Sequence, residues 1–200
     1  MAGYSLVVIA VVEMAINGWI AFVQVGTSDA EYYYGETKTF ETIIDRVEAN
    51  DDGWYRADML QPNMVDEATW HNLPSIGIFG STVPGEMVTT MGDLGFYTGA
   101  NEYLYYGATP FTNALFGVKY VYTREGDFAN ADMGLYDTED NVSVYKNLYN
   151  LPIGYMVNRE ILDFETLDNG PFTVQNELSG VTTGVEPIFS SIFDDMQTTT

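Results

Sequence analysis

One apolar stretch near the beginning of the sequence restricts the possible folds more than any other feature. Residues 4–25 contain a single formally charged side chain, Glu13, and the stretch approaches the length of a membrane-spanning helix. No Lys or Arg precedes it and no convincing cleavage site follows it. The stretch is therefore a poor match to a secretory signal.

Glu13 leaves two structures open for the apolar segment, residues 1–26. A carboxylate near the middle of a spanning helix costs about 2.5 to 3.5 kcal/mol, which argues against an ordinary lipid-exposed span. In the first structure, the segment is the end of a transmembrane helix that runs out into water. In the second, residues 6–12 form a buried central strand, because their β-branched side chains suit a sheet covered on both faces.

The charge of the chain excludes one class of partner. The sequence holds 29 Asp and Glu against 7 Lys and Arg, a formal net charge of −22, which repels the phosphates of nucleic acids. We therefore expect no nucleic-acid partner, and we interpret the acidity as a source of solubility in preference to a specific cation site. Cys is absent from the sequence, which excludes disulfides, thiolate metal sites and Cys nucleophiles.

Helices are predicted at several places after the apolar segment. Phe40, Ile43, Ile44 and Val47 recur at helical spacing, which indicates an amphipathic helix over residues 37–49. A Pro near the first turn predicts further helices over residues 84–94, 109–116 and 168–178, and Gly95 and Gly117 end the first two of these.

Strand patterns alternate with these helices and define the fold class. Strands are predicted over residues 54–60, 118–123, 142–146 and 153–157, with a long loop over residues 63–85 and an acidic, turn-rich connection over residues 127–141. We therefore predict an α/β fold, with α+β as a possible variant: a mixed sheet with flanking helices in a single layered domain. This domain is expected over residues 27–193, followed by a frayed tail over residues 194–200.

Six short segments resemble one family in sequence and in order. These segments are WYR at residues 54–56, YGATP at 106–110, LFGVKYV at 115–121, YKN at 145–147, LPIGYMV at 151–157 and NGPFTVQN at 169–176. They resemble the bacterial multi-spanning membrane proteins called YfhO, which look like glycosyltransferases of the integral-membrane GT-C type. Residues 115–157 form the most specific part of this resemblance.

The resemblance implies a role at the outer face of a bacterial cell membrane. Family members are several times longer, so the resemblance implies that these residues are the extracytoplasmic portion that follows a block of membrane helices. The catalytic acid of GT-C enzymes lies in an early extracytoplasmic loop that is absent here, so no catalytic residue is expected. The implied function is accessory: to position an envelope polymer of the teichoic-acid type for a parent glycosyltransferase, with the membrane and a glycan as partners.

Other kinds of chemistry find little support in the sequence. His71 is the only histidine and has no carboxylates at ligand spacing, so we expect no metal site and no cofactor. A G-x-S-x-G nucleophile motif is absent, which disfavours hydrolases. The acidic residues Asp132, Asp137, Glu139 and Asp140 lack the spacing of a Ca²⁺ loop, and we interpret them as a solvated turn.

Aromatic residues in the loop-rich part of the chain supply the candidate ligand contacts. Tyrosine and tryptophan rings stack on sugars while their polar atoms form hydrogen bonds, so Trp70, His71, Tyr105 and Tyr106 are candidates for ligand binding. Arg56 is one of few cations and is expected to pair with a carboxylate in the fold, or else to contact an anionic or sugar-phosphate ligand. The same aromatic residues also suit an alternative function, a secreted or surface-attached module that binds glycan or protein without transferase activity.

Overall fold

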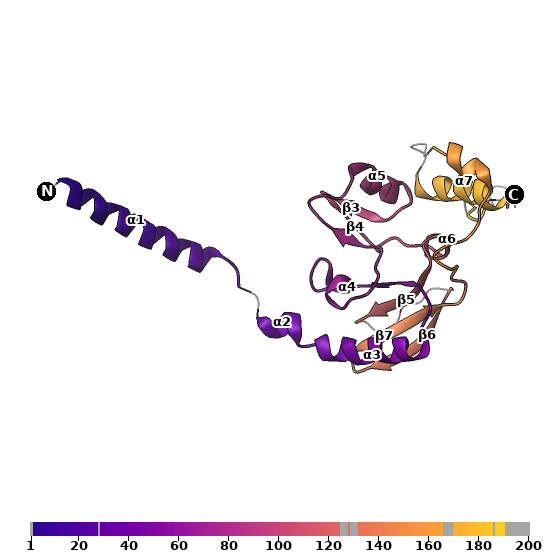
Figure 1. Cartoon of the computed structure of the whole chain (residues 1–200), viewed down its shortest axis with the longest axis horizontal. Helices are drawn as coiled ribbons and strands as arrows, with labels where there is room; N and C mark the ends of the chain where they lie inside the picture. Colours follow the sequence, from indigo (N-terminus) through magenta and orange to yellow (C-terminus); the bar gives the residue numbers. More distant parts are fainter. Residues whose placement is uncertain are drawn as a thin grey trace, which may run out of the picture. The chain divides into compact units, whose positions relative to one another are not determined.

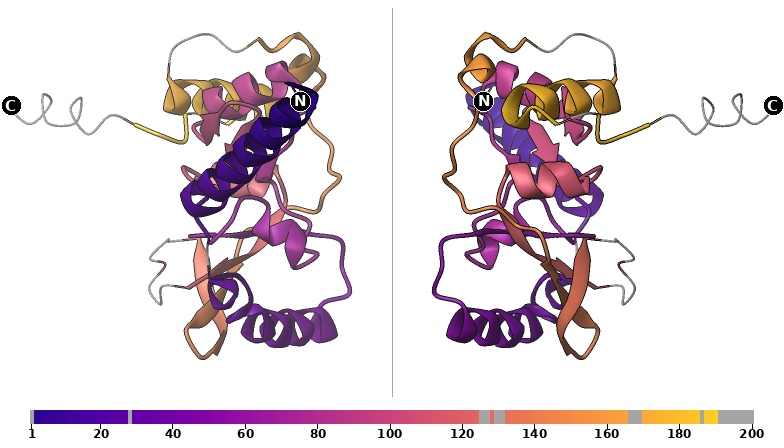
Figure 2. Two further views of the ribbon diagram at one scale, coloured as in Figure 1. Left: turned by 90° about the vertical axis from the view of Figure 1, so that its left-hand side faces the viewer. Right: turned by 90° about the vertical axis from the view of Figure 1, so that its right-hand side faces the viewer.

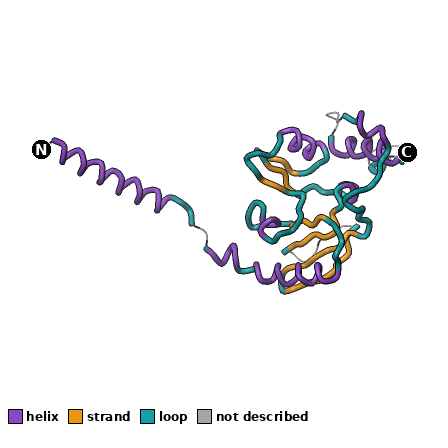
Figure 3. Tube along the Cα trace, in the orientation of Figure 1, coloured by secondary structure: helices purple, strands orange, loops and turns teal. Residues whose placement is uncertain are grey.

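The computed structural model describes residues 2–27, 29–124, 128, 132–165, 170–185 and 187–190. The chain divides into two compact units, Met1–Gly35 and Glu36–Thr200, and within the described residues all strands belong to the second unit (Figures 1 and 3). Our division of the chain at residues 26 and 193 stays a prediction. The expected frayed tail, residues 194–200, lies outside the described residues.

The first unit consists of two helices, α1 (Ala2–Gln24) and α2 (Ala30–Tyr34). Within α1, Gly3–Gln24 has a mean hydropathy of 2.2, and none of its most apolar window is buried in the structure. This helix is long and apolar enough to cross a membrane. The alternative of a buried strand over residues 6–12 is wrong, because all of these residues are helical and exposed.

A mixed four-stranded sheet forms the centre of the second unit. Its order is β1 (Arg56–Met59), β5 (Val118–Thr123), β7 (Val142–Asn147) and β6 (Met133–Glu139). β1 runs parallel to β5, whereas β5 with β7 and β7 with β6 are antiparallel. The predicted α/β fold with a mixed sheet and flanking helices is confirmed.

Helices cover both faces of this sheet. On one face, α3 (Thr37–Asn50) buries the four side chains expected from the sequence, Phe40, Ile43, Ile44 and Val47, against Tyr120, Tyr122, Val142 and Val144. On the other face, Val121 and Tyr145 belong to a second core cluster with residues of α5 (Gly85–Asp93) and α7 (Pro171–Thr183). Figures 1 and 2 show α3 at one end of the folded unit, with α5 and α7 together at the other end. Tyr120 and Val121, adjacent in sequence, thus contribute to different cores.

The remaining elements are short. A second, antiparallel sheet has the order β2 (Ile78–Phe79), β4 (Glu102–Leu104) and β3 (Tyr97–Gly99). α4 (Glu67–Trp70) follows β1, and a 3-10 helix, η1 (Arg159–Asp163), precedes α7. α6 (Pro110–Leu115) begins as predicted at Thr109, which forms a capping box with Thr112, and Gly117 follows its end with a φ of +65°.

Two predictions about the sheet are wrong. The acidic connection was expected to be turn-rich, yet Met133–Glu139 is strand β6, which forms the hairpin with β7. Residues 153–157, expected as a strand in the same sheet, form no strand. β6 forms the edge of the sheet beside β7. Charged residues are common on edge strands, and the acidic residues of β6, Asp137 and Glu139, both pair with Arg46.

Candidate functional site

Residues 151–157, the segment with the LPIGYMV motif, pass the C-terminal end of α6. The Tyr155 hydroxyl donates to the Leu115 carbonyl oxygen at 2.7 Å. Arg56 Nη1 donates to the neighbouring Phe116 carbonyl oxygen at 2.6 Å. A Cβ atom at Gly117 would lie 3.2 Å from the Leu151 carbonyl oxygen, so a glycine allows the close approach. Side chains from two distant segments therefore satisfy carbonyl groups that the helix end leaves unpaired.

A cleft of about 610 Å³ borders this segment and contains Arg56. We call it the aromatic cleft. It is lined by Glu48, Asp51, Asp52, Gly53, Trp54, Tyr55, Arg56, Leu73, Pro74 and Ile153. Most of these residues lie between the end of α3 and the first residue of β1, so one short connection builds most of the wall.

Hydrogen bonds and an ion pair fix the backbone of this connection next to Trp54. Asp51 Oδ1 accepts the Gly53 N–H at 3.1 Å, and its Oδ2 accepts the Tyr120 hydroxyl at 2.8 Å and pairs with Lys119. Burial opposes ionisation of Asp51, but the hydrogen bonds from Lys119 and Tyr120 lower the pKa of this carboxyl below its ordinary value. The Trp54 side chain that follows is 89% exposed. A large aromatic side chain is thus presented to solvent from a fixed backbone.

Tyr55 forms the inner side of the aromatic cleft. Its ring packs edge-on against Tyr120 with centroids 5.0 Å apart, and Lys119 Nζ lies 5.5 Å from the Tyr55 ring centroid. Burial raises the pKa of the Tyr55 hydroxyl, and the negative charges of Asp51 and Glu48 add to this effect. The hydroxyl therefore keeps its proton and serves as a donor and an acceptor.

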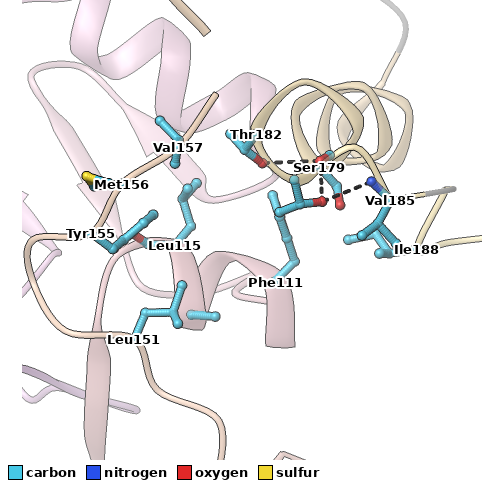
Figure 4. A pocket seen from close by; sticks show the side chains of 12 residues that line it. Phe111, Leu115, Leu151, Tyr155, Met156, Val157, Ser179, Thr182, Val185 and Ile188 are labelled. Atoms are coloured by element: carbon cyan, nitrogen blue, oxygen red, sulfur yellow. Dashed lines mark hydrogen bonds between the residues drawn. The ribbon is translucent and has the colours of Figure 1, made fainter. Parts of the chain in front are cut away.

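An apolar pocket of about 440 Å³ also borders residues 151–157 (Figure 4). Its lining comes from α6, residues 151–157, α7 and the residues after α7: Phe111, Ala114, Leu115, Leu151, Tyr155, Met156, Val157, Ser179, Thr182, Thr183, Val185 and Ile188. The hydroxyls of Thr182 and Thr183 donate to backbone carbonyls of their own helix, as the dashed lines in Figure 4 show in part. The pocket consequently offers apolar surface and few unsatisfied polar groups.

The predicted ligand-binding residues are not gathered in one place. Arg56 lines the aromatic cleft, and its hydrogen bond goes to a backbone carbonyl and not to a carboxylate of the described residues. Tyr105 is buried, its hydroxyl donates to Asn113 Oδ1 at 2.6 Å, and burial raises its pKa, as expected for a core residue. Tyr106 and Trp70 are 40% and 53% exposed, respectively. Ligand binding by these residues stays a prediction.

His71 belongs to a buried ionic cluster beneath α3. Its ring lies 4.9 Å from the ring of Phe40, and its Nε2 lies 3.9 Å from Glu67 Oε1. Arg124 pairs with both Glu36 and Glu67 and lies 4.7 Å from the Phe40 ring centroid. Burial alone would raise the pKa of Glu67, but His71, Arg124 and the Asn63 N–H lower it to about 2. This arrangement links α3, α4 and the end of β5.

Asp58 and the acidic residues of β6 also have partners within the fold. Asp58 is buried on β1 and accepts backbone N–H groups of Met59, Ile76 and Gly77, while burial raises the pKa of its carboxyl. In the acidic group predicted as a solvated turn, Asp137 and Glu139 each pair with Arg46 at 2.8 Å. Within the described residues, no group of three or more His, Asp or Glu side chains is arranged to hold a metal ion.

Sequence reasoning overlooked Trp54 and Tyr55, although both belong to the WYR motif from which only Arg56 was chosen. The motif segments at residues 54–56, 115–121 and 151–157 converge at the end of α6, where their side chains line the two cavities. The family model described as bacterial membrane protein YfhO matches residues 2–199. This chain belongs to the YfhO family.

The YfhO match covers both units of the chain, so α1 and the folded unit belong to one family region. The family is one of bacterial membrane proteins, in agreement with the apolar α1, whose most apolar window has no buried residue. No match was found among the curated proteins or among the solved structures.

Proposed function

We propose that this YfhO chain is the extracytoplasmic accessory domain of a GT-C-like membrane glycosyltransferase, and that it positions a saccharide-bearing acceptor near the membrane. In this proposal the domain does not transfer sugar by itself. The observation that carries the proposal is α1, a helix of membrane-spanning length and high mean hydropathy that is joined to a strongly acidic folded unit.

The charges that follow α1 support a location of the folded unit at the outer face of the membrane. Loops retained in the cytoplasm are enriched in Lys and Arg close to the ends of membrane helices. After α1, the first basic residue is Lys38, and residues 25–37 contain no Lys or Arg. The flank therefore lacks the positive charge that would retain it in the cytoplasm.

The accessory role rests on the placement of polar groups in the folded unit. Asp51 and Glu67 each have basic partners and lowered pKa values, so neither is arranged as a proton donor near neutral pH. Burial raises the pKa of Asp58, but this carboxyl is buried and accepts three backbone N–H groups, which is a structural role. The aromatic cleft offers surfaces for binding, and the resemblance to GT-C enzymes puts the catalytic acid in a loop outside these residues.

Topology reporters test the location. Alkaline phosphatase is active only outside the cytoplasm and green fluorescent protein fluoresces only inside, so each is fused after residue 200 of the full chain in a bacterial host. We expect phosphatase activity in the membrane fraction. Green fluorescence would contradict the extracytoplasmic location, and release of the chain from membranes by alkaline carbonate would favour the surface-attached binding module instead.

A transfer assay tests the accessory role. The full chain in detergent is incubated with lipid-linked radiolabelled sugar and an envelope polymer, alongside membranes that contain the whole parent protein. We expect labelled polymer from the parent and none from the chain. Transfer by the chain alone would show that it is catalytic and not accessory.

A further inference from the structure

We propose that the aromatic cleft is a binding site for an uncharged saccharide, with Trp54 as the surface on which a sugar ring stacks. Saccharide binding itself is inferred from the geometry of the cleft. The identification of that saccharide as part of the acceptor rests on the proposed function.

The first argument is the presentation of Trp54. Its side chain is 89% exposed at the wall of a concave site, while the Asp51 side chain fixes the turn that precedes it. A rigid aromatic group loses little conformational entropy on binding, and its face covers the apolar C–H face of a sugar ring. Stacking on Trp54 would bury apolar area that the folded chain leaves in water.

The second argument is the mixture of donors and acceptors around Trp54. A sugar hydroxyl is both a donor and an acceptor, so a saccharide site needs both kinds of group. Glu48 and Asp52 are exposed carboxylates that accept hydrogen bonds. Arg56 uses Nη1 for the Phe116 carbonyl oxygen, and a guanidinium has further N–H donors that remain available to a ligand. The Tyr55 hydroxyl, which keeps its proton, can act in both ways.

The third argument selects an uncharged ligand. Three carboxylates line the aromatic cleft, Glu48, Asp51 and Asp52, against the single guanidinium of Arg56. Lys119, whose Nζ lies 5.5 Å from the Tyr55 ring centroid, is paired with Asp51. Together with the net charge of −22, this balance repels phosphate groups. A phosphate-rich backbone of an envelope polymer is therefore disfavoured in the cleft, whereas an uncharged sugar carried by such a polymer is not.

The test follows the indole N–H signals of the full chain in detergent by NMR. The chain has three tryptophans, Trp19, Trp54 and Trp70, so the three signals can be assigned with single Trp→Phe variants. The probes are cellobiose, maltose and N,N′-diacetylchitobiose as uncharged disaccharides, with glucose 6-phosphate as the anionic sugar. We expect at least one disaccharide to shift the Trp54 signal saturably with a Kd of about 1 to 10 mM, with no saturable shift from glucose 6-phosphate.

Matched variants separate a stacking contact from a general change of structure. Because Trp54→Ala lacks the reporting indole, the affinities of the variants and of the parent chain are compared through saturation-transfer difference signals of the disaccharide. Trp54→Ala is expected to weaken disaccharide binding at least about tenfold, because aromatic anchors dominate such sites. Trp19→Ala removes a tryptophan of α1 that is 68% exposed and is not among the residues that line the cleft, and is expected to leave the affinity within about twofold. Thermal unfolding of both variants shows whether each remains folded.

Several results would overturn the saccharide site. These are the absence of a Trp54 shift with all three disaccharides at about 50 mM, far above a millimolar Kd, or an unchanged affinity of Trp54→Ala. A saturable shift of Trp54 by glucose 6-phosphate equal to that by the disaccharides would overturn the preference for an uncharged ligand. None of these results changes the topology or transfer experiments, so the failure of this inference is distinguishable from failure of the proposed function.

Discussion

Two helices of this protein, α1 and α3, put similar apolar residues to different uses. α3 places Phe40, Ile43, Ile44 and Val47 along one side, and each of them is at most 6% exposed. α1 has apolar side chains on every side, with Glu13, Asn17 and Gln24 at helical spacing on one face, and none of its most apolar window is buried. The distribution of apolar residues around a helix, and not their number alone, indicates whether protein or lipid surrounds it.

The largest expected effect tests this comparison with a pair of matched substitutions. Phe40→Ala removes a ring that is fully buried between α3 and the sheet, and should lower the free energy of unfolding by about 3 to 5 kcal/mol. Phe22→Ala removes a ring that is 74% exposed on α1, and should change it by less than about 0.5 kcal/mol. Guanidinium denaturation of the chain in detergent, followed by near-UV circular dichroism, measures both. An equal loss in the free energy of unfolding for the two variants would contradict the conclusion that α1 and α3 lie in different environments.

The buried Glu67 gives the folded unit a pH dependence. Its pKa is about 2 in the folded unit and near 4.5 when unfolded, so its ionised form stabilises the fold above pH 4.5. This contribution, up to about 3 kcal/mol, should be lost as the pH falls from 4.5 towards 2. The lowered pKa of Glu36 acts in the same direction through the shared Arg124.

Denaturation midpoints between pH 7 and pH 2.5 measure the Glu67 effect. Glu67→Gln should lower stability at neutral pH and flatten the acid limb of the curve. Glu41→Gln, on the exposed side of α3, is the matched control and should retain the slope of the parent chain. If the Glu67→Gln variant keeps the parent's slope, another group is responsible for acid unfolding.

Strand β5 should be the next most sensitive place. Val121 is fully buried on β5, which lies between β1 and β7. Val121→Ala removes two methyl groups and should cost about 1 to 3 kcal/mol through lost transfer free energy and the cavity left behind. An unchanged midpoint in denaturant would mean that Val121 does not pack as the structure describes.

Local signals in the sequence were sufficient to predict the elements around β5. The helical spacing of Phe40 to Val47 and the Thr109-Pro110 start of α6 are signals that act within one or two turns. β6 was missed because its acidic residues and Gly134 resemble a loop, and only its pairing with β7 and Arg46 makes it a strand. Strand formation depends on a partner that the local sequence does not reveal.

Residues 151–157 illustrate the converse case. Their alternating apolar side chains resemble a strand, yet these side chains line cavities, with Ile153 in the aromatic cleft and Tyr155 in the apolar pocket. The candidate site was predicted only at Arg56, because its wall combines residues about 100 positions apart in the sequence. The motif order indicated the family, but the convergence of the motifs at the end of α6 required the fold.

The smallest expected effect is that of salt on the melting temperature. It follows from a second difference between the two units, their charge. Residues 36–200 contain all the Lys and Arg and all but three of the Asp and Glu, so most of the self-repulsion lies in the folded unit. Added salt screens this repulsion, and we expect NaCl to raise the melting temperature by about 2 to 4 °C, which corresponds to roughly 1 kcal/mol for a domain of this size.

CaCl2 at matched ionic strength separates screening from binding in this last experiment. Within the described residues no cluster of metal-binding side chains is present, so Ca²⁺ should raise the melting temperature no more than Na⁺ does. A larger rise with Ca²⁺ would reveal a specific cation site. An unchanged melting temperature in both salts would show that ion pairs such as those of Arg46 and Arg124 already offset the repulsion.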